Sequence, residues 1–283
     1  MRSRIQQHIL PAFLVLLLSC TNSKQNGTRS DKDTLTPALS DKTADSLRLK
    51  YSHLISNVPI PFDVLQKLSN SYVVYKPELM NPISALSGYN QSDSKSLNLG
   101  VYGADLTYII SIGEFKEFAS HIHTIKRLAD ELGIPTAFDE GTMVRYNLNE
   151  TNRDTLQNVM YHSYHEIDRT LKANDRFGMA ALVVCGGWIE SLYLTTQTIG
   201  NNDNSGSYSE LYNLVFEQRK HLPNLINLLN DFKIPPFGKI ITSLEKVRKL
   251  YASSTDNNHL SLEEVKAISE EVAKLRMEIT HGS

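Results

Sequence analysis

Two carboxylates lie inside apolar stretches of the sequence. Asp105 is part of VYGADLTYI at 101–109, and Glu190 is part of CGGWIESLY at 185–193. Burying a carboxylate costs free energy unless a hydrogen-bond donor or a cation pairs with it. We therefore expect each acid to bond to an arginine or to a tyrosine hydroxyl. The arginines expected in this role are Arg145, Arg153 and Arg176.

These two acids have a structural and a functional interpretation. In the structural one, they form a buried hydrogen-bonded cluster that fixes the register of two helices. In the functional one, a small polar pocket lies between the helices, and Asp105 and Glu190 are its recognition groups or its acid and base. The walls of that pocket would be Tyr102, Tyr108 and Trp188. A di-metal site is disfavoured, because it needs Glu-x-x-His pairs and positions 108 and 193 hold tyrosine.

Four glycines flank the two acids. Each costs about 1 kcal/mol in a helix interior relative to alanine, so a packing gain must offset that loss. A helix without side chains at these positions lets another helix approach closely. We therefore expect the two acid-bearing helices to be in close contact at Gly100, Gly103, Gly186 and Gly187.

Two histidine pairs could bind a metal ion. His121 and His123 are two residues apart, so they point to different sides of a helix and do not share an ion. His162 and His165 share one face and are weak candidates for a metal site. The same face also carries the polar residues Asn158, Arg169 and Lys172. This pattern indicates a solvated surface, and we expect neither a metal nor another cofactor.

Known catalytic and nucleotide-binding motifs are absent from the sequence. It contains no GxGxxG, Walker A, CxxC, HExxH or nucleophile-elbow motif. The chain has 29 Lys+Arg against 31 Asp+Glu, with a formal net charge of −2 and no cluster of basic residues. Without a basic patch, nucleic acid is not an expected partner.

From residue 62 onward, apolar residues recur with helical period, and no stretch alternates as a strand does. We predict an all-α fold, a single bundle of about 7–8 helices within residues 45–283. The segment 175–199 is apolar around most of its circumference, which predicts a central helix. Ser261 and Glu264 match a capping box, and Thr136 is expected to cap a short helix. The predicted helices are 93–112, 114–132, 136–146, 152–171, 175–199, 208–231, 237–253 and 261–281.

The first 20 residues have the pattern of a targeting segment. Arg2 and Arg4 precede an apolar run of ten residues, Ile9–Leu18, which is too short to span a bilayer. The run ends in LLSC at 17–20, which resembles the lipobox of bacterial lipoproteins. That resemblance implies that residues 1–19 are a signal peptide and that Cys20 carries the lipid. Cys185 would then be the one remaining cysteine, and its apolar surroundings predict an inert core thiol.

Residues 20–44 are polar and lack an apolar face, which predicts a disordered tether behind the lipidated cysteine. Removing residues 1–19, which carry two arginines and no acid, would change the net charge from −2 to −4. Thr34 and Ser46 stand in Asp-Ser/Thr-aliphatic triplets that resemble an O-glycosylation motif of Bacteroidota periplasmic proteins. The resemblance to better-known lipoproteins implies Asp after the anchor for the inner membrane, so Thr21 favours the outer membrane, and we expect the periplasmic face.

The stretches LNLGVYGAD at 97–105, AFDE at 137–140, NRD at 152–154 and GGWIE at 186–190 are similar to an uncharacterised group of helical lipoproteins in Bacteroidota. The resemblance covers residues 90–200 and implies a helical fold and an envelope location, but no activity. We therefore expect a lipid-anchored module that binds or scaffolds an envelope protein or a small molecule. The alternative is an enzyme with a buried carboxylate site at Asp105 and Glu190.

Overall fold

The computed structural model describes residues 58–70, 73–149, 151–232, 235–254, 256 and 258–281, together with Ser46, Leu49 and Tyr51. The predicted signal peptide, Cys20, Thr34 and the tether lie outside these residues. Ser46 is exposed. Every regular element within the described residues is an α-helix or a 3-10 helix, which confirms the all-α prediction.

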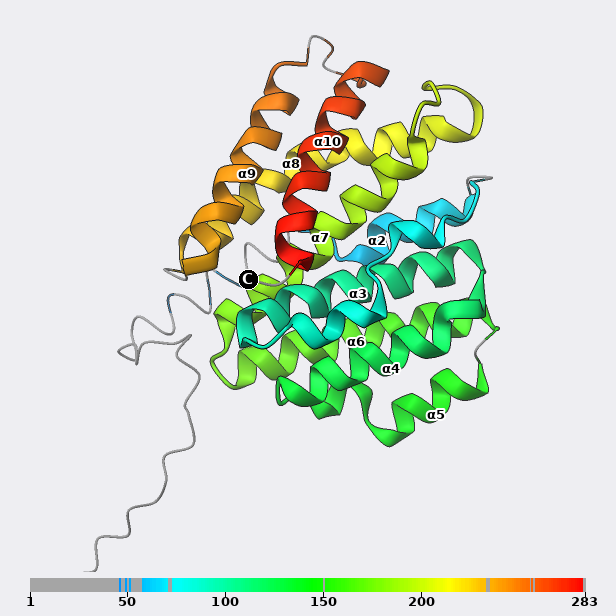
Figure 1. Cartoon of the computed structure of the whole chain (residues 1–283), viewed down its shortest axis with the longest axis vertical. Helices are drawn as coiled ribbons and strands as arrows, with labels where there is room; N and C mark the ends of the chain where they lie inside the picture. Colours follow the sequence, from blue (N-terminus) through cyan, green and yellow to red (C-terminus); the bar gives the residue numbers. More distant parts are fainter. Residues whose placement is uncertain are drawn as a thin grey trace, which may run out of the picture. The chain divides into compact units, whose positions relative to one another are not determined.

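Helices α3 (Ser92–Ile112) and α7 (Phe177–Ile199) form the centre of the fold and pack along each other (Figure 1). In α7, 20 of 23 residues are buried, and in α3, 16 of 21 are. Helix α7 is long and apolar enough to cross a membrane, yet 89% of its apolar stretch is buried inside the protein. Its hydrophobicity is therefore used in the core, as predicted for a central helix.

Gly100 and Gly186 let α3 and α7 approach closely. A Cβ atom at Gly100 would overlap the carbonyl oxygen of Val183, and one at Gly186 would overlap the carbonyl oxygen of Leu97. A Cβ atom at Gly100 would also overlap the backbone nitrogen of Gly187, so the predicted close contact is confirmed at Gly100, Gly186 and Gly187. Gly103 instead faces the hydroxyl of Tyr164 on α6, and Gly187 also faces the ring of Pro61 on α2.

The remaining helices cover this central pair (Figure 1). Helix α4 packs on α3, α6 contacts both central helices, and the short α5 packs on α6. Helices α8, α9 and α10 are in contact in chain order, and α8 and α10 also contact α7. The bounds are α2 Pro61–Leu65, α4 Phe118–Glu131, α5 Glu140–Leu148, α6 Arg153–Ala173, α8 Ser209–Asn230, α9 Pro235–Ala252 and α10 Leu262–Thr280.

Two of the predicted helix starts are confirmed, and one is wrong. The Ser261 hydroxyl accepts the N–H of Glu264, and the Glu264 carboxylate accepts the N–H of Ser261, so the capping box is present. Asn152 caps α6. The predicted cap at Thr136 is wrong, because Pro135–Phe138 forms a 3-10 helix and Asp139 caps α5 through the N–H of Thr142.

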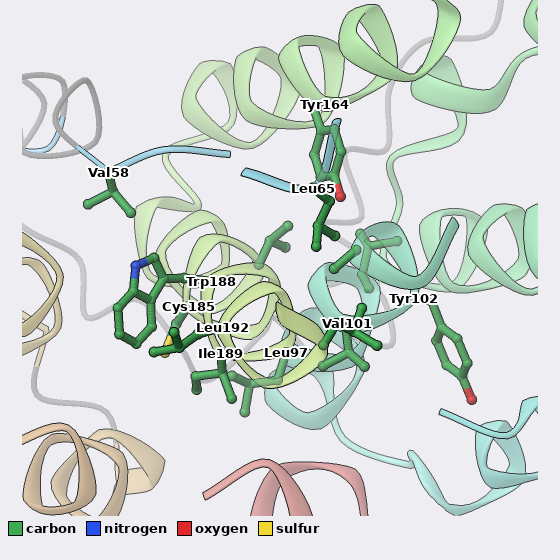
Figure 2. Packing of buried hydrophobic residues seen from close by; sticks show 14 of the residues in the cluster. Val58, Leu65, Leu97, Val101, Tyr102, Tyr164, Cys185, Trp188, Ile189 and Leu192 are labelled. Atoms are coloured by element: carbon green, nitrogen blue, oxygen red, sulfur yellow. The ribbon is translucent and has the colours of Figure 1, made fainter. Parts of the chain in front are cut away.

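The described residues contain nine α-helices, α2 to α10, rather than 7–8. The additional one is α2, whose five residues are too few to show a helical period. The buried core includes Leu97 and Val101 of α3 and Ile189 of α7, and Cys185 lies beside Trp188 and Leu192 on the side of α7 turned away from α3 (Figure 2). Cys185 is fully buried, and this burial raises the pKa of its thiol, in keeping with the predicted inert core residue.

Candidate functional site

Asp105 of α3 and Glu190 of α7 are brought together inside the protein. Both are fully buried, with 0% exposure, and each carboxyl group shifts the pKa of the other. The two helices approach at Gly100 and Gly186, which places the two acids at the same contact. The expectation that these acids form one buried cluster thus has a direct geometric basis.

Arg276 of α10 is the cation that pairs with Glu190. Its Nε donates to Oε2 at 2.9 Å, and its Nη2 donates to Oε1 at 3.1 Å, which is a two-point ion pair. Nη2 also donates to the carbonyl oxygen of Leu79 at 3.1 Å, and the guanidinium lies over the ring of Tyr193, 4.7 Å from its centroid. The Arg276 side chain is only 13% exposed, so the pair is a buried one.

The three arginines expected as partners serve other purposes. Arg153 donates to the carbonyl oxygen of Ile112 at the end of α3, and Arg176 donates to that of Leu132 at the end of α4. Arg145 donates to the Thr142 hydroxyl. Two of them therefore satisfy free carbonyls at helix C-termini, where a positive charge is also favourable. The prediction that they pair with the acids is wrong.

Position 276 carried a signal that the sequence analysis missed. Arg276 follows Val272 by four residues and precedes Thr280 by four, and both neighbours are buried on α10. A residue at that spacing shares their helix face. An arginine on a buried face needs a buried acid, and Glu190 is the acid that it meets.

The surroundings of the two acids favour a proton on Asp105 rather than on Glu190. The backbone N–H of Asn81 donates to its Oδ2 at 3.0 Å, whereas an ionised Oδ1 would have no donor. Burial raises the pKa of Asp105 well above its usual range, and the negative charge of Glu190 raises it further. Burial also raises the pKa of Glu190, but Arg276 and the hydrogen bond from Asp105 oppose that rise. We conclude that Asp105 is neutral and donates Oδ1–H to an ionised Glu190.

A second set of hydrogen bonds fixes Asn81 and the end of α10. The Tyr89 hydroxyl donates to the carbonyl oxygen of Thr280 at 2.8 Å, and Asn98 Nδ2 donates to that of Ile279 at 2.9 Å. Carbonyl oxygens only accept, so the remaining acceptors are the Tyr89 oxygen and Asn98 Oδ1. Asn81 Nδ2 donates to both, at 2.9 and 3.4 Å, which fixes the orientation of its amide group.

The three aromatic residues predicted as pocket walls are not grouped around the acids. The Tyr102 hydroxyl donates to the carbonyl oxygen of Pro82 at 2.9 Å, and the Tyr108 hydroxyl accepts the N–H of Lys76 at 3.1 Å. Both tyrosines thus hold the connection that precedes α3. Trp188 extends from α7 away from Tyr102 and donates to Gln218 of α8 at 3.0 Å (Figure 2).

A cleft of about 320 Å³ lies beside the buried network, between the end of α10 and the 3-10 helix Ile83–Gly88. Arg276 and Asn81 line the cleft and also belong to the network, whereas Asp105 and Glu190 are not among its lining residues. Pre-positioned polar groups in a concave wall are typical of a binding site. Other lining residues are Pro82, Ser84, Ala85 and His281.

A second, shallower cleft lies elsewhere on the protein. It has a volume of about 560 Å³ and is lined from α4, α5 and the 3-10 helix between them, by residues that include His123, Phe138 and Met143. Its lining includes none of the buried acids or their partners. We therefore take the cleft at Arg276 as the candidate site.

The histidines do not form a metal site with other ligands within the described residues, where no group of three or more His, Cys, Asp or Glu side chains is suitably placed. His162 and His165 are exposed on α6, and the rings of both contact the ring of Tyr161. His121 is buried, and its Nδ1 is bonded to the carbonyl oxygen of Glu117 at 2.9 Å. The predicted solvated face of α6 is present.

We compared the chain with protein-family models, with curated proteins and with solved structures, and none of them matches it.

Proposed function

We propose that this protein is a lipid-anchored binding module of the bacterial envelope, held by Cys20 at the periplasmic face of the outer membrane. The cleft at Arg276 is its ligand site. The proposal of the anchor rests on the charged, apolar and LLSC segments of residues 1–20 and on the resemblance to helical lipoproteins of Bacteroidota. The observation that carries the binding role is a buried guanidinium, fixed by Glu190 and Leu79, in the wall of a cleft.

Burying the Arg276–Glu190 ion pair and the Asn81 hydrogen bonds costs more free energy than a purely structural contact needs to. Replacing a buried ion pair by apolar side chains of similar volume is often neutral or stabilising, so stability alone gives little reason to keep one. Here the ion pair and the Asn81 bonds hold two planar polar groups, the Arg276 guanidinium and the Asn81 amide, in the cleft wall. Groups that are already fixed lose little conformational entropy when a ligand binds.

The same geometry supports binding over catalysis. An acid or base must come within hydrogen-bonding reach of the substrate, directly or through one water. Asp105 and Glu190 have no exposed surface and line neither cleft. Glu190 is also engaged by two donors of Arg276. The acids act through Arg276 and Asn81, which makes them positioning residues.

Two experiments test the proposal, one for the anchor and one for the ligand. Cells that produce the protein are fed a labelled fatty acid, and the wild type is compared with C20S and C185S. We expect label and outer-membrane fractionation in the wild type and in C185S, and loss of both in C20S. Label that persists in C20S contradicts the anchor.

For the ligand, the full chain is extracted from envelopes in a detergent without a sugar headgroup and analysed by native mass spectrometry. The variant S84W fills the cleft, and I83W is the matched control, because Ile83 is exposed on the same segment but is not a lining residue. We expect a bound species on the wild type and on I83W and a reduced amount on S84W. The binding role fails if no species is retained on any of the three.

A further inference from the structure

Arg276 has donors left over in the cleft wall. A guanidinium carries five N–H groups. Nε–H and one Nη2–H bond to Glu190, and the other Nη2–H bonds to Leu79. Within the described part of the chain, the two N–H groups of Nη1 have no hydrogen-bond partner. Arg276 therefore brings two unused donors to a cleft that it lines.

Asn81 brings an unused acceptor to the same cleft. Both of its Nδ2–H groups are used, one for Tyr89 and one for Asn98, and their directions are fixed by backbone carbonyls of α10. The amide therefore cannot turn over without losing both bonds. Its Oδ1 accepts no hydrogen bond from the described residues, and Asn81 lines the cleft.

The Arg276–Glu190 pair and Asn81 present these groups without a net charge. The positive charge of Arg276 is balanced by Glu190, and Asp105 is neutral. His281 bonds through Nδ1 to the carbonyl oxygen of Met277 at 3.0 Å, so Nδ1 carries the hydrogen and Nε2 of a neutral ring is an acceptor. Pro82 and Ala85 add apolar surface between the polar groups.

We propose that the cleft binds a small uncharged ligand with neighbouring hydroxyl groups, of the chemical class of a monosaccharide. This inference rests on the proposed binding function and specifies its ligand. Each sugar hydroxyl donates one hydrogen bond and accepts others, which matches the donors of Arg276 and the acceptors of Asn81 and His281. An anion gains less binding free energy from the Arg276 guanidinium, because Glu190 already neutralises its charge. The apolar surface of Pro82 and Ala85 suits the C–H groups of a sugar ring.

The test uses the full chain in a sugar-free detergent and saturation-transfer NMR at millimolar probe concentrations. The probes are glucose, galactose, mannose and N-acetylglucosamine, with acetate and inorganic phosphate as anionic comparisons. We expect saturation transfer to at least one of the four sugars, at least a tenfold weaker affinity in S84W, and an unchanged affinity in I83W. Thermal melts of both variants check that the fold is retained.

Three results would overturn the inference: no transfer to any of the four sugars, equal transfer to S84W and the wild type, or tighter binding of acetate or phosphate than of every sugar. If native mass spectrometry still finds a bound species that S84W loses, the proposed binding function stands and only the ligand class is wrong. If no species is retained and no probe binds, both proposals fail.

Discussion

Glu190 and Arg276 are 86 residues apart in the sequence and are joined by two hydrogen bonds of 2.9 and 3.1 Å. Glu190 belongs to the central helix α7, and Arg276 belongs to the last described helix, α10. The bond therefore fixes α10 on the core and sets the guanidinium in the wall of the cleft. Because both groups are buried, removing either one leaves the other charge without a partner.

The two acids should respond differently to amide substitution. In D105N the amide can donate to Glu190 and accept from Asn81 as the protonated acid does, with one N–H left unpaired. We expect D105N to keep its stability within about 1–2 kcal/mol. E190Q removes the charge that balances Arg276, and we expect a loss of about 3–5 kcal/mol. Urea denaturation at neutral pH measures both, and equal losses would contradict the assigned proton.

The stability difference between D105N and the wild type should depend on pH. The pKa of Asp105 is raised in the folded state, so its contribution is complete below the unfolded pKa of about 3.9 and is lost as the pH rises through the folded pKa. The amide side chain in D105N does not titrate. The stability of D105N relative to the wild type should therefore increase with pH, by up to about 1.4 kcal/mol per unit. Denaturation curves over the neutral and mildly acidic range test this prediction. A decrease with pH in the stability of D105N relative to the wild type would contradict it.

Alanine at the helix contact should be strongly destabilising. G100A and G186A each place a Cβ atom against backbone of the facing helix, which has no flexible end that could move aside. We expect a loss of at least about 3 kcal/mol for each, typical of severe overpacking. The control is G141A in α5, where the nearest atoms are at 3.7 and 3.8 Å and alanine should be neutral or stabilising by up to about 1 kcal/mol. Similar melting temperatures for all three would refute the close contact.

The Tyr89 hydroxyl should hold the C-terminal turn of α10. Y89F removes the bond to Thr280 and leaves the Asn81 N–H that bonded to Tyr89 without its acceptor, for an expected loss of about 1–3 kcal/mol. The control Y251F removes one buried hydroxyl bond of the same length, 2.8 Å, to Val215. We expect faster amide exchange near residue 280 in Y89F only. Equal amide exchange near residue 280 in Y89F and Y251F would contradict this role of the Tyr89 hydroxyl.

The sequence predicted the fold well because its signals were local or periodic. The apolar period, the capping box at Ser261 and the helix start at Asn152 each depend on residues within a few positions of one another. The prediction of a cap at Thr136 was wrong because Thr136 and Asp139 both suit a helix start. Pro135 favours a helical turn at its own position, and that turn is the 3-10 helix that precedes α5. Helix α2 was missed because it is a single short turn.

The site was predicted only in part, because its contacts join segments distant in the chain. Burial of Asp105 and Glu190 followed from their apolar neighbours, and the glycines predicted the contact between their helices. The partner Arg276 and the role of Asn81 depend on how α10 and the connection before α3 are folded against the core. No local pattern places those segments, and only the buried spacing of Arg276 on α10 could have indicated it.

The central claim is that a neutral Asp105 donates its proton to an ionised Glu190, which in turn holds Arg276 in the cleft wall. Infrared difference spectroscopy of the full chain in light and heavy water measures it most directly, because a protonated carboxyl group has a carbonyl band that shifts on deuteration. At neutral pH we predict one such buried band in the wild type that disappears in D105N. Absence of the band from the wild type, or its persistence in D105N, would contradict the account.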